Sequence, residues 1–356
     1  MTTTENDTLL SVLCAGDRFI RAQALADAAA QLAPQVRTTL WESDWPDKPF
    51  RSIDGVKEAA GDPANLAAAA GDATVLLTHL APVTAQVIDA APQLRVIGVT
   101  RGGPVNVDLP AATARGIPVI YLPGRNLEAV AEYVIGVIIG LTRNIGAGAQ
   151  DLSGGQWDAQ WYRFERTGPQ LSGATVGLVG LGAIGARVAT LLQAFGTTVI
   201  AHDPYADPDT AARAGVRLVD LDELLAISDI ISLHARLTDD TRMMIGPAAL
   251  AGIKRGAYLV NTARGELVEE AAVLAALDDG RLRGAALDVF HPEPPDPEHS
   301  LLSRPDVLAT PHLAGASREV ALKSIARVTR EVGAHLAGQA ITNCANPDWT
   351  AHGDRR

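Results

Sequence analysis

The chain of 356 residues is 47% hydrophobic, which is enough for two globular domains with substantial cores. Its formal net charge is −11 and it has no Lys/Arg run, so neither nucleic acid nor a membrane is expected as a partner. The most apolar stretch, residues 133–141, is far shorter than the roughly 20 residues of a bilayer span. The N-terminus lacks the features of a secretion signal, and Cys14 and Cys344 allow at most one disulfide, so we expect a cytoplasmic protein.

The first third of the chain alternates short strand patterns with alanine-rich helical patterns. A helix is predicted over residues 21–32, and candidate strands occur at 9–14, 38–41, 74–77, 95–100 and 117–121. This alternation is typical of a parallel sheet with helices on both faces. The block contains no glycine-rich nucleotide motif.

A long helix is predicted to follow, with Asn126 as its N-cap. Its apolar stripe is formed by Leu127, Val130, Val134, Ile138, Leu141 and Ile145. Val137 and Ile139 lie outside this stripe, so the helix should be covered on more than one side. The cover is either its own domain or another subunit, and we favour a homodimer.

A glycine-rich turn is the most specific pattern in the sequence. Residues 174–179 have the character of a buried strand, and Gly180, Gly182 and Gly185 follow in the spacing G-x-G-x-x-G. The next helix has an apolar face, formed by Val188, Leu191, Leu192 and Phe195. Such a turn lets a pyrophosphate approach backbone N–H groups at a helix N-terminus. The following strand ends at Asp203, whose carboxylate would accept hydrogen bonds from a ribose and repel a 2′-phosphate, so the pattern predicts NAD rather than NADP.

The second block continues with further strand patterns, at residues 197–202, 230–234, 258–261, 285–289 and 307–310. Residues 317–336 are again helical, and a helix this late in the chain could return to the first block. The cofactor domain would then be an insertion into the first domain.

Three segments after the glycine turn resemble the D-2-hydroxyacid dehydrogenase family, which includes phosphoglycerate dehydrogenase and the glyoxylate and hydroxypyruvate reductases. They are NTARGELV at 261–268, DVFHPEP at 288–294 and TPHLAGA at 310–316. The resemblance implies an α/β fold of two doubly wound domains, a Rossmann NAD-binding domain inserted into a flavodoxin-like substrate domain. The expected boundaries are 126–317 for the NAD-binding domain, 1–125 plus 318–346 for the substrate domain, and 347–356 for a C-terminal tail.

By this resemblance, Arg264, Glu293 and His312 form the catalytic trio of an NAD-dependent dehydrogenase acting on a 2-hydroxy or 2-keto acid. The chemistry is consistent with these residue types. A neutral histidine can take the hydroxyl proton and a protonated one can return it, while an adjacent carboxylate orients the ring and stabilises its charged form. An arginine can direct two donors at a carboxylate. No metal is expected.

Residues 100–108 resemble the family's substrate loop. Because Pro104 has no N–H, the predicted substrate contacts here are Arg101, Gly102 and Gly103, together with Arg264 and His312. Arg101 could bind a second anionic group, as on a phosphorylated sugar acid such as 3-phosphoglycerate. The expected cofactor contacts are Gly180, Gly182, Ala183, Ile184, Gly185, Asp203, Pro204, His234, Thr238, Thr262, Ala263, Arg264, Asp288, His312 and Gly315.

Several alternatives stay open. Arg236 stands where the family usually has proline, which leaves NADP possible as cofactor. The aromatic and basic segment 156–166 could form a surface loop, a subunit contact or a pocket mouth, with Trp161, Tyr162 and Arg163 as its main candidates. The alternative function is an NAD(H)-sensing, corepressor-like binding protein of the same fold. For the enzyme, the active site is expected in the cleft between the domains, with hinges near Asn126 and Ser317.

Overall fold

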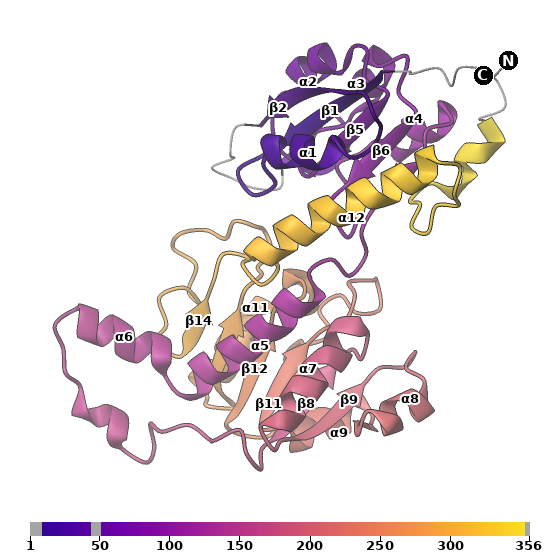
Figure 1. Cartoon of the computed structure of the whole chain (residues 1–356). Coiled ribbons are helices and arrows are strands. Elements are labelled where there is room, and N and C mark those ends of the chain that lie inside the picture. The colour runs from indigo at the N-terminus through magenta and orange to yellow at the C-terminus, as the bar shows by residue number, and fades with distance from the viewer. Residues whose placement is uncertain (1–8, 44–50, 353–356) are drawn as a thin grey trace, which may run out of the picture. The chain divides into compact units, whose positions relative to one another are not determined.

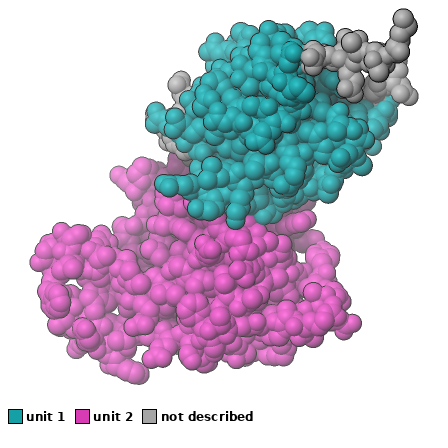
Figure 2. Space-filling model, in the orientation of Figure 1, with its two compact units in different colours: residues 1–125, 317–356 teal, residues 126–316 magenta. Residues whose placement is uncertain are grey.

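The structure is a computed structural model in which residues 9–43 and 51–352 are described. The chain divides into two compact units, shown in Figures 1 and 2. Unit 1 comprises residues 1–125 and 317–356, and unit 2 comprises residues 126–316. The chain therefore crosses between the units twice.

Unit 1 is built on a five-stranded parallel sheet in the order β2-β1-β5-β6-β7. Counting only these strands, the order is 2-1-3-4-5, which is that of flavodoxin-like folds. The strands are β1 (Leu10–Gly16), β2 (Val36–Glu42), β5 (Val75–Thr78), β6 (Val96–Val99) and β7 (Val119–Ile120). The helices are α1 (Ala22–Ala29), α2 (Pro63–Ala70), α3 (Ala85–Ala90), α4 (Leu109–Ala114) and α12 (Arg318–Leu336).

Alternating side chains on these strands fill two cores, one on each face of the sheet. Leu76 and Ile97 pack with residues of α2 and α3, whereas Leu77 and Val96 pack with residues of α1 and α12. Ser317 caps α12 by accepting a hydrogen bond from the backbone N–H of Val320 at 3.1 Å. The late helix thus packs on unit 1 (Figure 1).

Two parts of unit 1 differ from the sequence prediction. The antiparallel hairpin β3 (Arg51–Ile53) and β4 (Val56–Ala59) was not predicted, because its strands are too short for a clear pattern. Residues 347–352, expected to lie in a tail, form the 3₁₀ helix η3 (Pro347–His352), which contacts α4. Buried Asn346 secures this end of the chain, accepting a hydrogen bond from the Val119 N–H at 2.8 Å.

Unit 2 contains a seven-stranded sheet in the order β10-β9-β8-β11-β12-β13-β14, with all strand pairs parallel. Counted within the unit, the order is 3-2-1-4-5-6-7, the Rossmann order with one added strand. The strands are β8 (Thr175–Val179), β9 (Thr198–His202), β10 (Arg217–Leu218), β11 (Ile230–Leu233), β12 (Ala257–Asn261), β13 (Leu282–Leu287) and β14 (Val307–Ala309).

Helices cover both faces of this sheet (Figure 1). One core joins the sheet to α5 (Leu127–Thr142) and α7 (Ala183–Ala194). The other joins it to α9 (Leu221–Ile227), α10 (Pro247–Ala251) and α11 (Glu270–Asp278), while α8 (Pro208–Arg213) precedes β10. Val188 and Leu192 of α7 are buried as predicted, but Phe195 is 44% exposed because the helix ends at Ala194.

The long predicted helix is broken. α5 ends at Thr142, Asn144 adopts a left-handed conformation with φ of 54°, and α6 (Ile145–Ser153) begins at an angle of 64° to α5. Ile145 is therefore 56% exposed on α6 rather than part of the α5 stripe. Asn126 precedes α5, but its side chain forms no capping hydrogen bond. Val137 and Ile139 both pack into the core of unit 2, so its own unit covers α5 on these sides.

Within the described residues, no single helix is both long and apolar enough to cross a membrane. The bent pair α5 and α6 meets that test only by length and composition.

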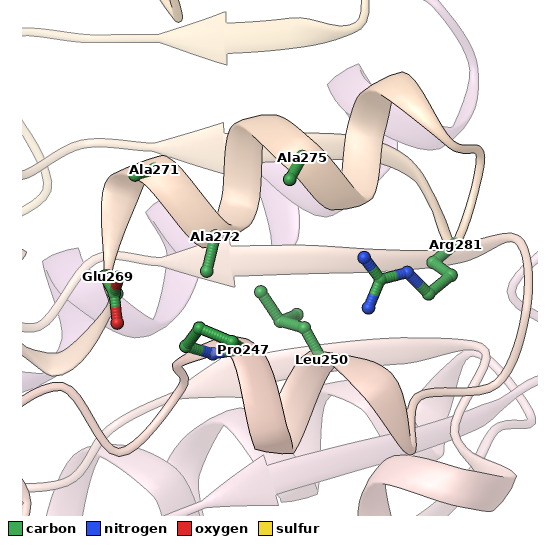
Figure 3. A pocket seen from close by; sticks show the side chains of 7 residues that line it. All are labelled: Pro247, Leu250, Glu269, Ala271, Ala272, Ala275 and Arg281. Carbon is green, nitrogen blue, oxygen red and sulfur yellow. The ribbon is translucent and has the colours of Figure 1, made fainter.

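A surface hollow of about 230 Å³ lies between α10 and α11. Figure 3 shows Glu269 and Arg281 at its two ends, with Leu250 and alanine side chains between them. None of the predicted site residues lines it, so it plays no part in the site described below.

Candidate active site

The three glycines of the G-x-G-x-x-G turn differ in what surrounds them. Gly180 has φ of +99°, and a Cβ there would lie 2.6 Å from the backbone nitrogen of Ala235. A Cβ on Gly185 would lie 2.3 Å from the carbonyl oxygen of Gly180, so this glycine permits close contact between helix and strand. At Gly182, no described atom lies within 4 Å of the Cβ position. Only the middle glycine leaves open space.

That open space lies at the N-terminus of α7. Gly182 is the N-cap, and no described side chain caps the helix there. The N–H groups of Ala183 and Ile184 belong to the first helical turn, where the helix itself supplies no acceptor. Uncapped donors, a positive dipole end and an open glycine together suit the pyrophosphate of a dinucleotide.

Asp203 lies directly after β9 and is tied to the glycine turn. One carboxylate oxygen accepts from the backbone N–H of Leu181 at 2.7 Å, and the other accepts from that of Tyr205 at 2.9 Å. Each oxygen keeps a lone pair for a ribose hydroxyl. Pro204, the next residue, is exposed.

The loop after β11 carries the other predicted adenosine-side residues. Burial lowers the pKa of His234 to about 4, so its ring is neutral near pH 7, and its Nε2 lies 3.0 Å from the hydroxyl of Ser232. Further along, Thr241 closes the turn by accepting from the Thr238 N–H and donating to the carbonyl of Arg236, at 2.8 and 2.6 Å. Arg236 and Thr238 are exposed.

Glu293 and His312 are in direct contact. The Nδ1 atom of His312 lies 2.9 Å from Oε2 of Glu293, and the other carboxylate oxygen accepts from the Phe290 N–H at 3.1 Å. Burial alone would raise the pKa of Glu293, but the hydrogen bond and charge of His312, the Phe290 N–H and the charge of Arg264 lower it below its ordinary range. The Glu293 side chain is therefore a carboxylate that orients the imidazole.

Asp288 shapes the loop that carries His312. Its carboxylate accepts from the Thr310 hydroxyl at 2.7 Å and from the backbone N–H groups of Leu313 and Ala314 at 2.8 and 2.9 Å. This buried clamp accompanies a left-handed backbone at His312, with φ of 55°. The sequence predicted Asp288 as a cofactor contact. That role stays a prediction, and in the structure its carboxylate accepts hydrogen bonds from its own chain.

Arg264 is positioned by the end of β12. The amide of buried Asn261 donates to the Arg264 carbonyl at 2.8 Å and accepts from the Ala263 N–H at 3.1 Å. The guanidinium donates to the Ala263 carbonyl at 2.7 Å. Thr262 is 8% exposed, and its hydroxyl has no hydrogen-bond partner among the described residues. An unpartnered buried hydroxyl of this kind is suited to a bound ligand.

The two segments carrying Arg264 and Glu293 meet at a glycine. A Cβ on Gly265 would lie 2.2 Å from the carbonyl carbon of Phe290, so only glycine allows this approach. Sequence reasoning missed this role, although the glycine directly follows Arg264. It also missed Tyr133 of α5, which hydrogen-bonds to Thr310 and Asp288. Burial raises the pKa of Tyr133.

The predicted substrate loop lies in unit 1, after β6. The β3–β4 hairpin holds it, because the Lys57 N–H donates to the Val105 carbonyl at 2.9 Å and the Arg101 guanidinium binds the carbonyl and carboxylate of Glu58. No described residue accepts a hydrogen bond from the N–H of Gly102 or Gly103, and the Cβ position of Gly103 is open. The two glycines suit a bound anion, while Arg101 is already paired.

The aromatic segment 156–166 lies beyond α6 and includes the 3₁₀ helix η1 (Ala159–Tyr162). The Trp161 indole donates to Asp151 at 2.9 Å, and the Arg166 guanidinium lies 3.9 Å from the centre of its ring. Trp157, Tyr162 and Phe164 are 85, 89 and 88% exposed.

Comparison with known proteins now identifies the family. Residues 135–314 match the model of the D-isomer specific 2-hydroxyacid dehydrogenase NAD-binding domain. A glyoxylate reductase of Thermofilum pendens is 40% identical over 259 residues, which cover 72% of this chain and 76% of that protein. The chain belongs to this family. The enzyme accordingly binds NAD, as the glycine turn predicted.

Other relatives extend the similarity across both units. A D-3-phosphoglycerate dehydrogenase of Mycobacterium tuberculosis is 38% identical over 322 residues, covering 89% of this chain but only 58% of that protein. Among solved structures, a Thermus thermophilus protein matches with a TM-score of 0.78 and 32% identity, covering 94% of this chain and all of that one. The Escherichia coli D-lactate dehydrogenase matches with a TM-score of 0.75 at 26% identity, covering 95% and 100% of the two chains.

We expect Asp203 to make the enzyme prefer NADH over NADPH. We expect Asp203→Asn to raise the ratio of kcat/KM for NADPH over NADH by about tenfold or more, because it removes a negative charge from beside a 2′-phosphate while keeping an amide oxygen as acceptor. The ratio is measured with one keto acid and both cofactors. An unchanged ratio, with both kcat/KM values measurable, would show that the Asp203 carboxylate does not contact the ribose.

Proposed function

We propose that this enzyme transfers a hydride between NAD(H) and C2 of a D-2-hydroxy acid or 2-keto acid, with Arg264, Glu293 and His312 as its catalytic residues. The 2.9 Å contact between Glu293 and His312 carries the proposal, since it joins an oriented acid–base histidine to a cofactor-binding fold. Unit 2 is then the NAD-binding domain and unit 1 the substrate domain.

In the reducing direction, the bound dinucleotide supplies the hydride that forms the new C–H bond at C2. The carbonyl π electrons move to oxygen, and protonated His312 donates its Nε2 proton there, which yields the alcohol and a neutral ring. In the oxidising direction, neutral His312 takes the hydroxyl proton, the C2–H bond breaks and its hydride passes to NAD. Glu293 holds Nδ1 throughout, so that Nε2 is the nitrogen that exchanges the proton.

Arg264 and the two open glycines serve the substrate carboxylate. Arg264 supplies a fixed charge with several donors, which lysine could not match in geometry. Gly102 and Gly103 supply backbone N–H groups that no described residue uses. These contacts place C2 and restrict the substrate to 2-oxo or 2-hydroxy acids.

The substrate itself is tested with a panel. NADH oxidation at 340 nm is followed with glyoxylate, hydroxypyruvate, pyruvate and 3-phosphohydroxypyruvate, and NAD reduction with D- and L-lactate, D-glycerate and 3-phosphoglycerate. The names of the relatives, glyoxylate reductase and D-3-phosphoglycerate dehydrogenase, support this range. Turnover of a 2-keto acid with its D-product supports the proposal. No turnover by a folded, NADH-binding protein would contradict it.

The lowered pKa of Glu293 makes part of the stability depend on pH. Its folded-state pKa lies below the ordinary value of 4.5, so the carboxylate stabilises the fold above about pH 4.5 and loses this effect as pH falls through the lower value. We expect Glu293→Gln to reduce the free energy of unfolding in urea at pH 7, with the difference from wild type shrinking toward pH 3. A difference that stays constant over this range would contradict the assignment.

We propose a homodimer formed through α6 and the aromatic segment 156–166. None of the α6 residues is buried, and Trp157, Tyr162 and Phe164 are almost fully exposed on a projection of unit 2 (Figure 1). Large exposed aromatic side chains are typical of protein interfaces. We expect wild type to sediment as a dimer and the triple variant Trp157→Ser, Tyr162→Ser, Phe164→Ser as a monomer. A monomeric wild type, or a dimeric variant, would contradict the proposal.

A further inference from the structure

A chain of three polar side chains crosses the interior of unit 1 and is not used by the chemistry above. Asp17, which is fully buried, accepts a hydrogen bond from Nδ1 of His79 at 2.7 Å. On the other side of the ring, Nε2 of His79 lies 3.3 Å from Nη2 of Arg125. Asp17 is itself fixed by the backbone N–H groups of Phe19 and Ile20, each at 2.8 Å.

The direction of these hydrogen bonds follows from the donor types. A guanidinium can only donate, so Nε2 of His79 accepts and Nδ1 carries the proton given to Asp17. The ring is therefore neutral. The pKa of His79 is lowered, because burial lowers it more than the hydrogen bond and charge of Asp17 raise it. A lowered pKa agrees with a neutral ring. His79 thus acts as an orienting acceptor that fixes the guanidinium of Arg125.

Arg125 retains an unused donor. Its Nη1 is shielded from solvent and has no hydrogen-bond partner among the described residues, although the residue as a whole is partly exposed. Burial and the nearby charge of Arg101 lower the pKa of Arg125 to about 10. A buried, unpartnered cationic N–H is costly, and an anion would recover that cost.

The two arginines near this point differ in what they can still bind. Arg101 is paired with Glu58, and its side chain is only 12% exposed. Arg125 faces a neutral imidazole, and its carboxylate counterpart, Asp17, lies on the far side of that ring. Of the two, Arg125 is the one with a free charge-bearing donor.

Arg125 also lies close to the substrate loop. The Leu122 N–H donates to the carbonyl of Arg101 at 2.7 Å, and the Arg125 N–H donates to the carbonyl of Leu122 at 3.3 Å. Gly102 approaches the same Leu122 carbonyl, with 3.7 Å to its Cβ position. Arg125 is the last residue of unit 1, directly before the chain enters unit 2 at Asn126.

We propose that Arg125, positioned by His79 and Asp17, binds a second anionic group of the substrate, at a distance from the carboxylate beside C2. The inference rests on the proposed function, in which Gly102, Gly103 and Arg264 already serve that first carboxylate. The substrate class is therefore a 2-hydroxy or 2-keto acid with a phosphate or second carboxylate. Arg101 is not the residue that holds this group, because Glu58 occupies it.

Two matched substrate pairs test the subsite. Hydroxypyruvate and 3-phosphohydroxypyruvate differ by a phosphate, and pyruvate and oxaloacetate differ by a carboxylate. We expect wild type to favour the doubly anionic member of at least one pair in kcat/KM. In Arg125→Gln that preference should fall roughly 10- to 100-fold, the effect of losing one charge-assisted hydrogen bond. The pair affected identifies the anion as phosphate or carboxylate.

Control variants separate binding from folding. Arg330→Gln removes an exposed guanidinium from α12 and should leave both ratios unchanged. Arg125→Lys should restore part of the preference through its charge. His79→Gln should raise KM for the doubly anionic member more than it lowers kcat, as expected for a residue that only positions Arg125.

A readout without turnover keeps the two proposals distinct. Stabilisation of wild type by 3-phosphoglycerate should exceed that by glycerate in a thermal melt, and Arg125→Gln should remove the difference. The subsite is overturned if wild type shows no preference for the doubly anionic compound, either in kcat/KM or in thermal stabilisation. It is also overturned if Arg125→Gln lowers kcat/KM equally for both substrates of each pair. Absence of turnover on every keto acid contradicts the proposed function instead. The subsite is then tested only by the difference in thermal stabilisation between 3-phosphoglycerate and glycerate.

Discussion

Replacing His312 by asparagine should lower kcat by about 10²- to 10⁴-fold while NADH still binds, because it removes the proton donor and leaves the glycine turn intact. Asparagine is the appropriate replacement. His312 has φ of 55°, a conformation that asparagine tolerates better than alanine does, so the variant tests chemistry with little added backbone strain. The measurements are steady-state kinetics with a keto acid from the panel and NADH titration followed by its fluorescence.

The control for this result is His335→Asn, which changes a histidine of α12 that packs edge-on against Trp349. Its turnover should match wild type. If His312→Asn reacted at the wild-type rate, the acid–base role would have to move to another group. If it lost NADH binding as well, His312 would be a structural part of the cofactor site.

Gly182→Val should weaken NADH binding roughly 10- to 100-fold without lowering thermal stability. No described atom lies within 4 Å of the Cβ position, and φ of −68° suits an ordinary residue, so the folded protein accommodates the side chain. The side chain would instead occupy the space through which a pyrophosphate approaches the first turn of α7. Losing one or two of its charge-assisted hydrogen bonds accounts for the expected factor.

Gly185→Ala is the contrasting variant. Its Cβ would lie 2.3 Å from the Gly180 carbonyl oxygen, which is backbone and cannot rotate away, so we expect a destabilisation of about 1–3 kcal/mol. Thermal melts and NADH titrations of both variants provide the comparison. Unchanged NADH affinity in folded Gly182→Val would show that the pyrophosphate does not lie over this glycine.

The elements that the sequence predicted well are those with strong local patterns. β8, the glycine turn and α7 agree with the prediction, because a buried β-branched run and a glycine spacing leave few alternatives. The family resemblance, the α/β fold and NAD as cofactor are confirmed. The roles of Arg264, Glu293 and His312 stay predictions, supported by the contact between the last two.

What sequence reasoning missed depends on long-range contacts. The hairpin at 51–59 gives no clear pattern, yet it supplies Glu58, which pairs with Arg101 across 43 residues. The break after α5 was missed because Ile145 happens to continue the apolar stripe, while the left-handed Asn144 carries no signal apart from its residue type. Asp17, His79 and Arg125 are far apart in the sequence, and only the fold shows that they form one chain of hydrogen bonds.

Unit 2 begins at Asn126 and ends at Ala316, and its two ends touch. A Cβ on Gly315 would lie 2.8 Å from the side-chain nitrogen of Asn126, so Gly315 is packed against the start of the unit. A domain whose termini adjoin can be inserted into a host, or removed from it, with little disturbance to either fold. The cofactor-binding part of this chain therefore has the geometry of a transferable module, one that could be expressed alone or exchanged with that of a relative.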